Sequence, residues 1–393
     1  MNNDWTTCKI GDICKKICSG GTPKSNEPSY YGGNIPWLNT KEINFNRIYN
    51  TEKYITSSGF DNSSAKWIDA NSVIVALYGA TAAKVSINTI PLTTNQACCN
   101  LTIDETVADY RYVYYYLRRN YQHLALLANG GAQQNLNAQQ IKDFNIILPQ
   151  LPIQHKIANI LWTIDDKIEL NRRINDNLEE QAKALFKSWF VDSQNNDWKK
   201  IRLEEILGIG KTSIIPAQSP DTIFEHYSLP AFDNGTRPVY EKGCAIKSSK
   251  FYIQKNMFLF SKLNPRIKRI WFPNIQTKKA ICSTEFIPYR PKDASLLGFC
   301  YSIVNSEAFY EYVLSLTNGS TGSHQRFHPI ATLDYSLKIP DKDIIKKFES
   351  IVKSLYELIA KNRTENERLA SLRDTLLPKL MSGELSIEEV SFD

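Results

Sequence analysis

The dominant pattern along the chain is a long stretch of helical periodicity that occurs twice. Between residues 152 and 192 apolar side chains recur at steps of three and four, and no glycine interrupts the stretch. This spacing places the apolar side chains along one narrow face of a helix, and Pro152 suits its first turn. A shift of 191 residues aligns a second stretch, with Phe348 in the place of Ile157. The sequence therefore predicts two equivalent long helices.

Every seventh residue of the two stretches lies on one seam of the predicted helices. Four of the five seam residues are apolar in each stretch, whereas the middle one is an asparagine in both. A polar residue at a core position of a coiled coil lowers stability and fixes the register and the partner. The predicted seam consists of Ile157, Ile164, Asn171, Leu178 and Leu185 in the first helix and of Phe348, Leu355, Asn362, Leu369 and Leu376 in the second.

Antiparallel pairing of the two helices would bring their midpoints together, so that Asn171 and Asn362 would meet. In the alternative interpretation, both asparagines lie at a solvated break in the seam. Pro378 predicts that the second helix ends near Leu377, because a proline ring clashes with the preceding turn of a helix. Two paired helices of this length would form a spacer and a docking surface.

The repeat extends into the segment that precedes each helix, and both segments contain short elements of both kinds, strands and helices. Short apolar runs predict strands at residues 73–77, 145–148 and 257–260, and helical patterns cover residues 107–128 and 307–316. Each segment is therefore predicted to be a mixed α/β (α+β) domain.

The alternation of mixed segments and helices predicts the domain organisation. We expect a first domain at residues 1–150, a central long helix at 151–195, a second domain at 196–340, and a C-terminal long helix with a tail at 341–393.

Composition supports a globular protein with more than one domain. A chain of 393 residues exceeds one ordinary core, and its 42% hydrophobic and 22% charged residues are globular values. No apolar run is as long as a membrane span, and the N-terminus lacks the apolar core of a signal peptide, so we expect a cytoplasmic protein. The eight cysteines form no C-x-x-C pair, which favours reduced thiols over a zinc site.

Positive charge is concentrated in the second mixed segment. The whole chain has a net charge of +6, and residues 196–339 contain 19 lysines and arginines against 12 aspartates and glutamates. An excess of positive charge in one domain favours a polyanionic partner.

Three motifs resemble catalytic or nucleotide sites, but each lacks an essential residue. A glycine-rich stretch ending in Lys-Thr has Glu205 where a phosphate-binding loop needs its first glycine. His324 and His328 have the spacing of a metalloprotease pair, but Gln325 occupies the place of the glutamate. A nuclease-like acidic pair has Tyr227 in the position of the lysine. We therefore predict no catalytic residue and no metal site, which favours a binding role.

Loops with cations and amides after predicted strands are the best candidates for contacts with DNA. Residues 262–269 carry four cations in eight positions, and the matching residues 79–84 carry one cation among small side chains. Such loops suit phosphates, and arginine also binds guanine bidentately. The candidate contact residues are Trp37, Lys41, Lys84, Gln134, Tyr227, Lys262, Asn264, Arg266, Lys268, Arg269 and Arg326. In the alternative interpretation, the basic loop is a solubilising surface and the aromatic residues belong to the core.

Several longer motifs occur in a fixed order along nearly the whole chain. They are GGTP at residues 20–23, IPWLNTKEI at 35–43, ILPQLPIQHKIANIL at 147–161, NRRINDNLEEQAKALFKSWFVD at 171–192 and ENERLASLRDTLLPKLMSGEL at 365–385. With these motifs the chain resembles the specificity subunits of type I restriction–modification systems. One departure concerns the helix starts, since Gln154 in the first copy is replaced by Ile345 in the second.

The resemblance implies a fold and a function. It implies two tandem target-recognition domains, each followed by a long helix, with the two helices paired as an antiparallel coiled coil. Each domain would read one half of a split target in double-stranded DNA, within a site-specific endonuclease and adenine methyltransferase complex of bacteria or archaea. Two modification (methyltransferase) subunits and the restriction (translocase–nuclease) subunits would be the partners, and S-adenosylmethionine, ATP and Mg²⁺ would belong to them.

The difference between the two candidate loops predicts an asymmetric target. Two other functions remain as alternatives. One is a self-contained DNA-modifying enzyme, such as a fused methyltransferase or nuclease, and the other is a helical scaffold that binds only protein.

Overall fold

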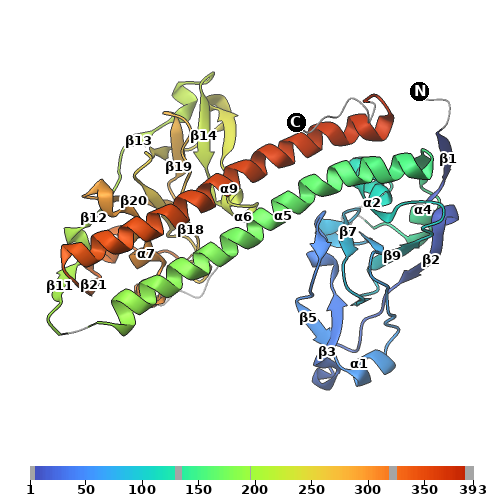
Figure 1. Ribbon diagram of the computed structural model, residues 1–393, viewed down its shortest axis with the longest axis horizontal. Coiled ribbons are helices and arrows are strands. Elements are labelled where there is room, and N and C mark those ends of the chain that lie inside the picture. Colours follow the sequence, from blue (N-terminus) through green and yellow to red (C-terminus); the bar gives the residue numbers. More distant parts are fainter. Residues whose placement is uncertain (1–4, 129–134, 195, 318–324, 386–393) are drawn as a thin grey trace. The chain divides into compact units, whose positions relative to one another are not determined.

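The chain forms two compact units, each with its own globular block. The computed structural model describes residues 5–128, 135–194, 196–317 and 325–385. The first unit consists of Met1–Asp166 with Ala370–Asp393, and the second consists of Lys167–Leu369. Each unit also contains part of both long helices, α5 (Leu151–Lys187) and α9 (Lys342–Ser382) (Figure 1).

Three small sheets build the block of the first unit. The largest has the order β2 (Cys14–Ser19), β9 (Cys98–Ile103), β6 (Val73–Ala76), β7 (Val85–Asn88) and β4 (Arg47–Ile48). The others are β5 (Lys53–Ile55), β3 (Tyr31–Leu38) and β8 (Thr93–Thr94), and the pair β1 (Thr6–Lys9) and β10 (Asn145–Leu148). The strands predicted at 73–77 and 145–148 are thus confirmed as β6 and β10. Burial of every residue of β6 explains its continuous apolar run.

Short helices cover this block. They are α1 (Ser57–Asp61), α2 (Tyr110–Arg119), α3 (Tyr121–Leu126) and α4 (Ala138–Lys142). The helix predicted at 107–128 is therefore divided into α2 and α3. Asp109 caps the start of α2 with its carboxylate, and Asn120 separates the two helices.

The block of the second unit also contains three sheets. The five-stranded one has the order β13 (Ser213–Ile214), β16 (Lys250–Tyr252), β19 (Ala280–Ser283), β14 (Ile223–Tyr227) and β15 (Val239–Lys242). The four-stranded one has the order β12 (Leu207–Ile209), β20 (Phe286–Pro291), β17 (Phe258–Ser261) and β18 (Ile270–Trp271). A two-stranded ribbon pairs β11 (Lys199–Arg202) with β21 (Ser336–Ile339).

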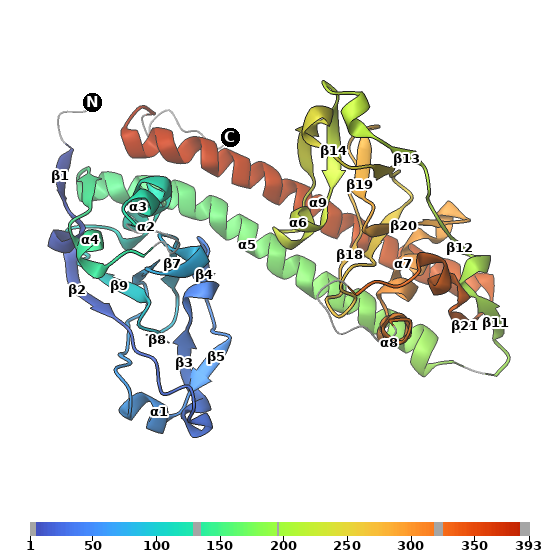
Figure 2. The same ribbon diagram turned by 180° about the vertical axis from the view of Figure 1, so that it is seen from behind.

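One face of the four-stranded sheet packs against helices. α7 (Leu297–Asn305) and α8 (Glu307–Ser315) share a core with β12, β17 and β20 and with the first turns of α9 (Figure 2). The remaining short helix is α6 (Leu229–Asp233). The strand predicted at 257–260 and the helix predicted at 307–316 are confirmed as β17 and α8, within one residue at each end.

The long helices match the predicted stretches except at one end. α5 begins at Leu151, and a π-helical turn at Ser188–Asp192 extends it to the predicted end. The predicted end of the second helix near Leu377 is wrong, because α9 continues through Pro378 to Ser382. Leu380 and Met381 are fully buried in the core of the first unit. Burial of two such side chains contributes about 3–6 kcal/mol, which offsets the roughly 3 kcal/mol cost of a proline inside a helix.

The two helices pair in antiparallel directions along the predicted seam. In the first unit Leu161 of α5 and Leu380 of α9 share one core, and in the second unit Ala182 and Phe348 do. The seam residues Ile157, Ile164, Asn171, Phe348 and Asn362 are buried, whereas Leu178, Leu185, Leu355, Leu369 and Leu376 are partly buried.

The two helix starts use different residues for the same task. In the first copy the buried side chain of Gln154 accepts the N–H of Asp109 at the start of α2 and donates to the Pro149 carbonyl. In the second copy Glu349, one turn beyond Ile345, accepts the N–H groups of Gly298 and Phe299 at the start of α7. Both side chains satisfy helix amides that have no partner within their own helix.

Candidate nucleic-acid interface and helix seam

A short loop follows strand β6 in the first block and is held by the backbone. Tyr78 forms an antiparallel bridge with Asn135, and the Leu77 carbonyl accepts the N–H of Leu136 at 2.9 Å. Gly79 then adopts a left-handed conformation with φ of +79°, which glycine reaches without strain. The side chain of Tyr78 remains 42% exposed, and Asn135 is exposed as well.

The loop after strand β17 repeats this backbone arrangement in the second block. Leu263 forms an antiparallel bridge with Arg326, and the Asn264 N–H donates to the Gln325 carbonyl at 3.0 Å. Asn264 is left-handed with φ of +48°, as Gly79 is in the first block. The two loops therefore share one backbone frame and differ in their side chains.

The four cations of residues 262–269 fall into two groups. Arg269 forms two hydrogen bonds with the Asp233 carboxylate, at 2.7 and 3.0 Å. Lys268 donates to the Asn305 carbonyl and to Glu307, and burial lowers the pKa of its ammonium group. Lys262 is half-buried and Arg266 is exposed, and neither has a carboxylate partner in the part of the chain that the structure describes. Lys262 and Arg266 are thus the cations available to a polyanion.

Arg326 is held by a carboxylate on the neighbouring turn. Its Nε and Nη2 atoms donate to the two oxygens of Glu285, at 3.0 and 2.9 Å. The hydrogen bond with Glu285 raises the pKa of the Arg326 guanidinium. Half of the Arg326 side chain remains exposed, at 51%.

The candidate cations of the first block, exposed Lys41 and half-buried Lys84, both have polar partners. Lys84 donates to the amide oxygen of Asn44 at 2.8 Å. Lys41 forms an ion pair with Glu52, and the hydrogen bond with Glu52 raises the pKa of its ammonium group. Gln134, which the sequence also proposes as a contact residue, lies outside the described residues.

The two aromatic candidates belong to the core, as the alternative interpretation held. Trp37 is 4% exposed, and its indole N–H donates to the Gly21 carbonyl at 2.9 Å. Tyr227 is fully buried against Trp271, and its hydroxyl donates to Glu225 at 2.7 Å. The prediction that these side chains contact DNA is therefore wrong for this conformation, because no face of either ring is open to a ligand.

The polar positions of the helix seam find partners one turn away from the predicted ones. Asn171 donates to Glu365 and Asn366, at 2.8 and 2.9 Å, and Asn362 donates to Asn175 at 2.9 Å. The expectation that Asn171 and Asn362 meet is wrong, because the helices are offset by about one turn. A solvated break is also excluded, since the two side chains are only 1% and 7% exposed.

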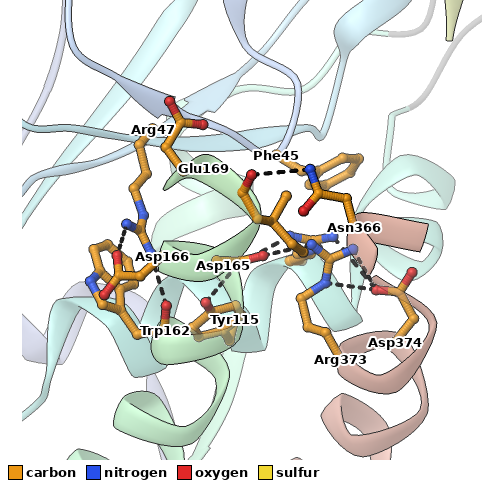
Figure 3. A network of polar contacts seen from close by, with 12 residues as sticks. Phe45, Arg47, Tyr115, Trp162, Asp165, Asp166, Glu169, Asn366, Arg373 and Asp374 are labelled. Atoms are coloured by element: carbon orange, nitrogen blue, oxygen red, sulfur yellow. Dashed lines mark hydrogen bonds and ion pairs between the residues drawn. The ribbon is translucent and has the colours of Figure 1, made fainter. Parts of the chain in front are cut away.

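In the first unit a network of charged residues joins α5, α9 and α2 (Figure 3). Asp165 on α5 accepts from the Tyr115 hydroxyl and from Arg373 on α9, both at 2.6 Å. Arg47 stacks on Trp162, with its guanidinium carbon 3.5 Å from the ring centroid, and pairs with Asp166. The network fixes the globular block to both helices at once.

The residues described here show neither a metal site nor a membrane helix. Within these parts of the chain, no three His, Cys, Asp or Glu side chains are grouped so that they could hold a metal ion. No helix among them is long and apolar enough to cross a bilayer.

Comparison with known proteins finds sequence similarity to DNA specificity subunits. The sequence pattern described as "Type I restriction modification DNA specificity domain" matches residues 2–180. The type I restriction enzyme MjaIX specificity subunit of Methanocaldococcus jannaschii is 29% identical over 98% of this chain and 95% of its own length. Over nearly its whole length the chain is thus similar to the specificity subunits of type I restriction–modification systems.

Two further comparisons agree with this family. The HindI specificity subunit of Haemophilus influenzae is 23% identical, over 66% of this chain and 72% of its own length. The crystal structure of a type I restriction–modification S subunit from M. genitalium has the same fold, with a TM-score of 0.60 at 18% identity and 97% coverage of both chains. These similarities support a role in DNA target specificity.

Proposed function

We propose that this chain is the non-catalytic subunit that reads DNA in a type I restriction–modification complex. In this proposal each globular block reads one part of a split, asymmetric target in double-stranded DNA. The helix pair docks two modification subunits, and restriction subunits join the assembly. In this proposal S-adenosylmethionine, ATP and Mg²⁺ act in those partner subunits.

The observation that carries the proposal is the repeated loop frame with unequal side chains. Both blocks tie the loop after a central strand to a second segment by the same bridge, and both place a left-handed residue directly after it. The loop of the first block then presents small side chains and Lys84, whereas the loop of the second presents Lys262 and Arg266. A constant backbone with different donors would read two different short sequences.

The extent of protection on DNA tests the split target. The full chain is assembled with its modification subunits, and the complex is footprinted on the motif found by methylation mapping in cells that carry the gene. Two protected base blocks separated by unread base pairs are expected. A single continuous block, or no sequence preference, would contradict the proposal.

Charge reversal of Lys262 and Arg266 tests the contribution of the second block. Each phosphate contact adds about 0.9 to the slope of log affinity against log salt concentration. The double substitution K262E/R266E is therefore expected to reduce the magnitude of that slope by about 1 to 2 in a fluorescence-anisotropy titration of the complex. Reversal at Lys255, which is also exposed in the same block, serves as the matched control and should leave the slope unchanged. An unchanged slope for K262E/R266E would exclude this loop from the DNA interface.

A further inference from the structure

The second block holds one exposed arginine in a fixed orientation. Arg326 is joined to Leu263 by a backbone bridge, and its guanidinium forms a two-pronged pair with Glu285. The backbone of Glu285 is itself held at two points, because its carbonyl accepts the N–H of Lys262 at 2.9 Å and its N–H donates to the Ser283 hydroxyl. The Glu285 side chain is only 25% exposed. Three segments far apart in the sequence thus set the direction of one side chain.

The hydrogen bonds with Glu285 leave a defined set of donors free. A guanidinium has five N–H groups in one plane, and the carboxylate occupies one from Nε and one from Nη2. The edge formed by Nη1 and the second hydrogen of Nη2 is not used by these bonds. Two parallel N–H groups on one edge match the O6 and N7 acceptors of guanine in the major groove.

The neighbouring cations have a different character. Lys268 and Arg269 bind acidic groups of their own block and are mostly covered, with side chains 21% and 12% exposed. Arg266 is exposed, but no described side chain orients it. Only Arg326, among the cations of this loop frame that the structure describes, combines exposure with a carboxylate that fixes its plane.

We propose that Arg326 determines specificity for a guanine in the half of the target read by the second block, and that Glu285 is its positioning residue. This inference rests on the proposed function. Asn135 holds the equivalent place in the first block, where an amide replaces the guanidinium, so the same guanine is not expected in the other half. Because a surface ion pair contributes little stability, the pair can orient Arg326 without being required for folding.

The test uses the full chain assembled with its modification subunits. Duplexes carry the mapped target, and each base pair of the second half is replaced in turn. In one further duplex the guanine is replaced by 7-deazaguanine, which removes the N7 acceptor and keeps the base pairing. A bidentate arginine–guanine contact corresponds to about 5- to 150-fold discrimination, from roughly 1–3 kcal/mol.

For the unmodified complex, one guanine is expected to show this discrimination and sensitivity to 7-deazaguanine. R326A should abolish both effects at that guanine and leave the first half of the target unchanged. R326K should fail to restore them, because lysine keeps the charge but lacks the planar fork. E285Q should retain binding with weaker discrimination, and K255A should behave as the unmodified chain.

Other outcomes would overturn the assignment. If R326A weakens all duplexes equally, or if R326K restores full discrimination, Arg326 contacts phosphate and reads no base. If R326A has no effect, the arginine lies outside the interface. If the unmodified complex shows no sequence preference at all, the proposed function itself fails. If R326A unfolds at a lower temperature than the unmodified chain, the E285Q variant provides the test. Unchanged discrimination in E285Q would show that Glu285 does not position Arg326.

Discussion

The buried amide pair in the helix seam allows a quantitative prediction about stability and register. Asn362 donates to the Oδ1 atom of Asn175 at 2.9 Å, and each side chain is 7% exposed. Replacing Asn362 with leucine leaves the Asn175 oxygen buried without its donor. An unsatisfied buried polar group costs about 1–3 kcal/mol, so N362L should lower the free energy of unfolding by this amount. N175L should have a similar effect, because it removes the acceptor.

The double substitution N175L/N362L should behave differently from the sum of its parts. Leucine has the same number of side-chain heavy atoms and the same branching as asparagine, and two leucines at facing seam positions bury apolar surface without polar atoms. Replacement of both partners of a buried hydrogen bond is close to neutral or stabilising. The double variant is therefore expected to unfold at or above the temperature of either single variant. Its cost would be a less strictly defined helix register.

Differential scanning calorimetry of the full chain measures the effect. The two units are fitted as separate transitions, because a chain with two units need not unfold in one step. For a unit of this size, 1 kcal/mol shifts the melting temperature by about 2–4 °C, so each single variant should shift one transition by roughly 2–12 °C. N177L, at an exposed asparagine of the same helix, is the matched control. A double variant that loses the sum of both single effects would refute the reasoning.

Two further predictions concern the helix ends. Burial raises the pKa of Glu349 above its unfolded value, so its contribution to stability is greatest below the unfolded pKa and is lost as pH rises through the folded pKa. The melting temperature of E349Q should therefore fall less steeply with rising pH near that range than the melting temperature of the native chain. E349A should lower the free energy of unfolding by about 1–3 kcal/mol at every pH, because two helix amides lose their acceptor. Equal pH profiles for the native and E349Q chains would contradict this prediction. P378A should raise the unfolding temperature of the first unit, because alanine restores a backbone N–H donor inside α9 at a position that remains helical. A lower unfolding temperature for P378A would contradict this prediction.

The long helices could be predicted from the sequence because their signal is local. Apolar residues at steps of three and four, without glycine, define both the helices and the buried face. The end of α9 could not be predicted in the same way. Local rules place a stop before Pro378, but the helix continues because Leu380 and Met381 reach a core formed by residues more than 200 positions earlier. Tertiary burial therefore outweighed the local rule.

The seam asparagines show which features of the helix pair a heptad pattern predicts and which it does not. The pattern correctly identifies Asn171 and Asn362 as seam positions, since both are buried. It contains no information about the offset between the helices, which decides the partner of each amide. Asn175, one turn along α5, is the partner of Asn362 and lies outside the chosen heptad position. The signal that could have found it is the short spacing Asn171–Asn175 on one helix face.

The basic loop at residues 262–269 shows that a count of charges in the sequence does not predict which cations are free to bind a partner. A count of charges in the sequence treats all four cations of this loop alike and predicts that all four face a polyanion. They are Lys262, Arg266, Lys268 and Arg269. The structure neutralises Lys268 and Arg269 through acidic residues about forty positions away. Net charge of the block is unchanged by such pairing, but the positions that can bind phosphate are reduced.

The repeat is most informative where the backbone is equal and the side chains are not. Gly79 and Asn264 are both left-handed, so a turn is required at that place whichever residue occupies it. The residues bridged beside this turn, Asn135 and Arg326, differ in charge and hydrogen-bonding pattern. A difference at a position whose backbone is fixed cannot serve the fold of the loop, because the other copy achieves the same fold without it. Such positions are therefore where differences in target recognition should be sought first.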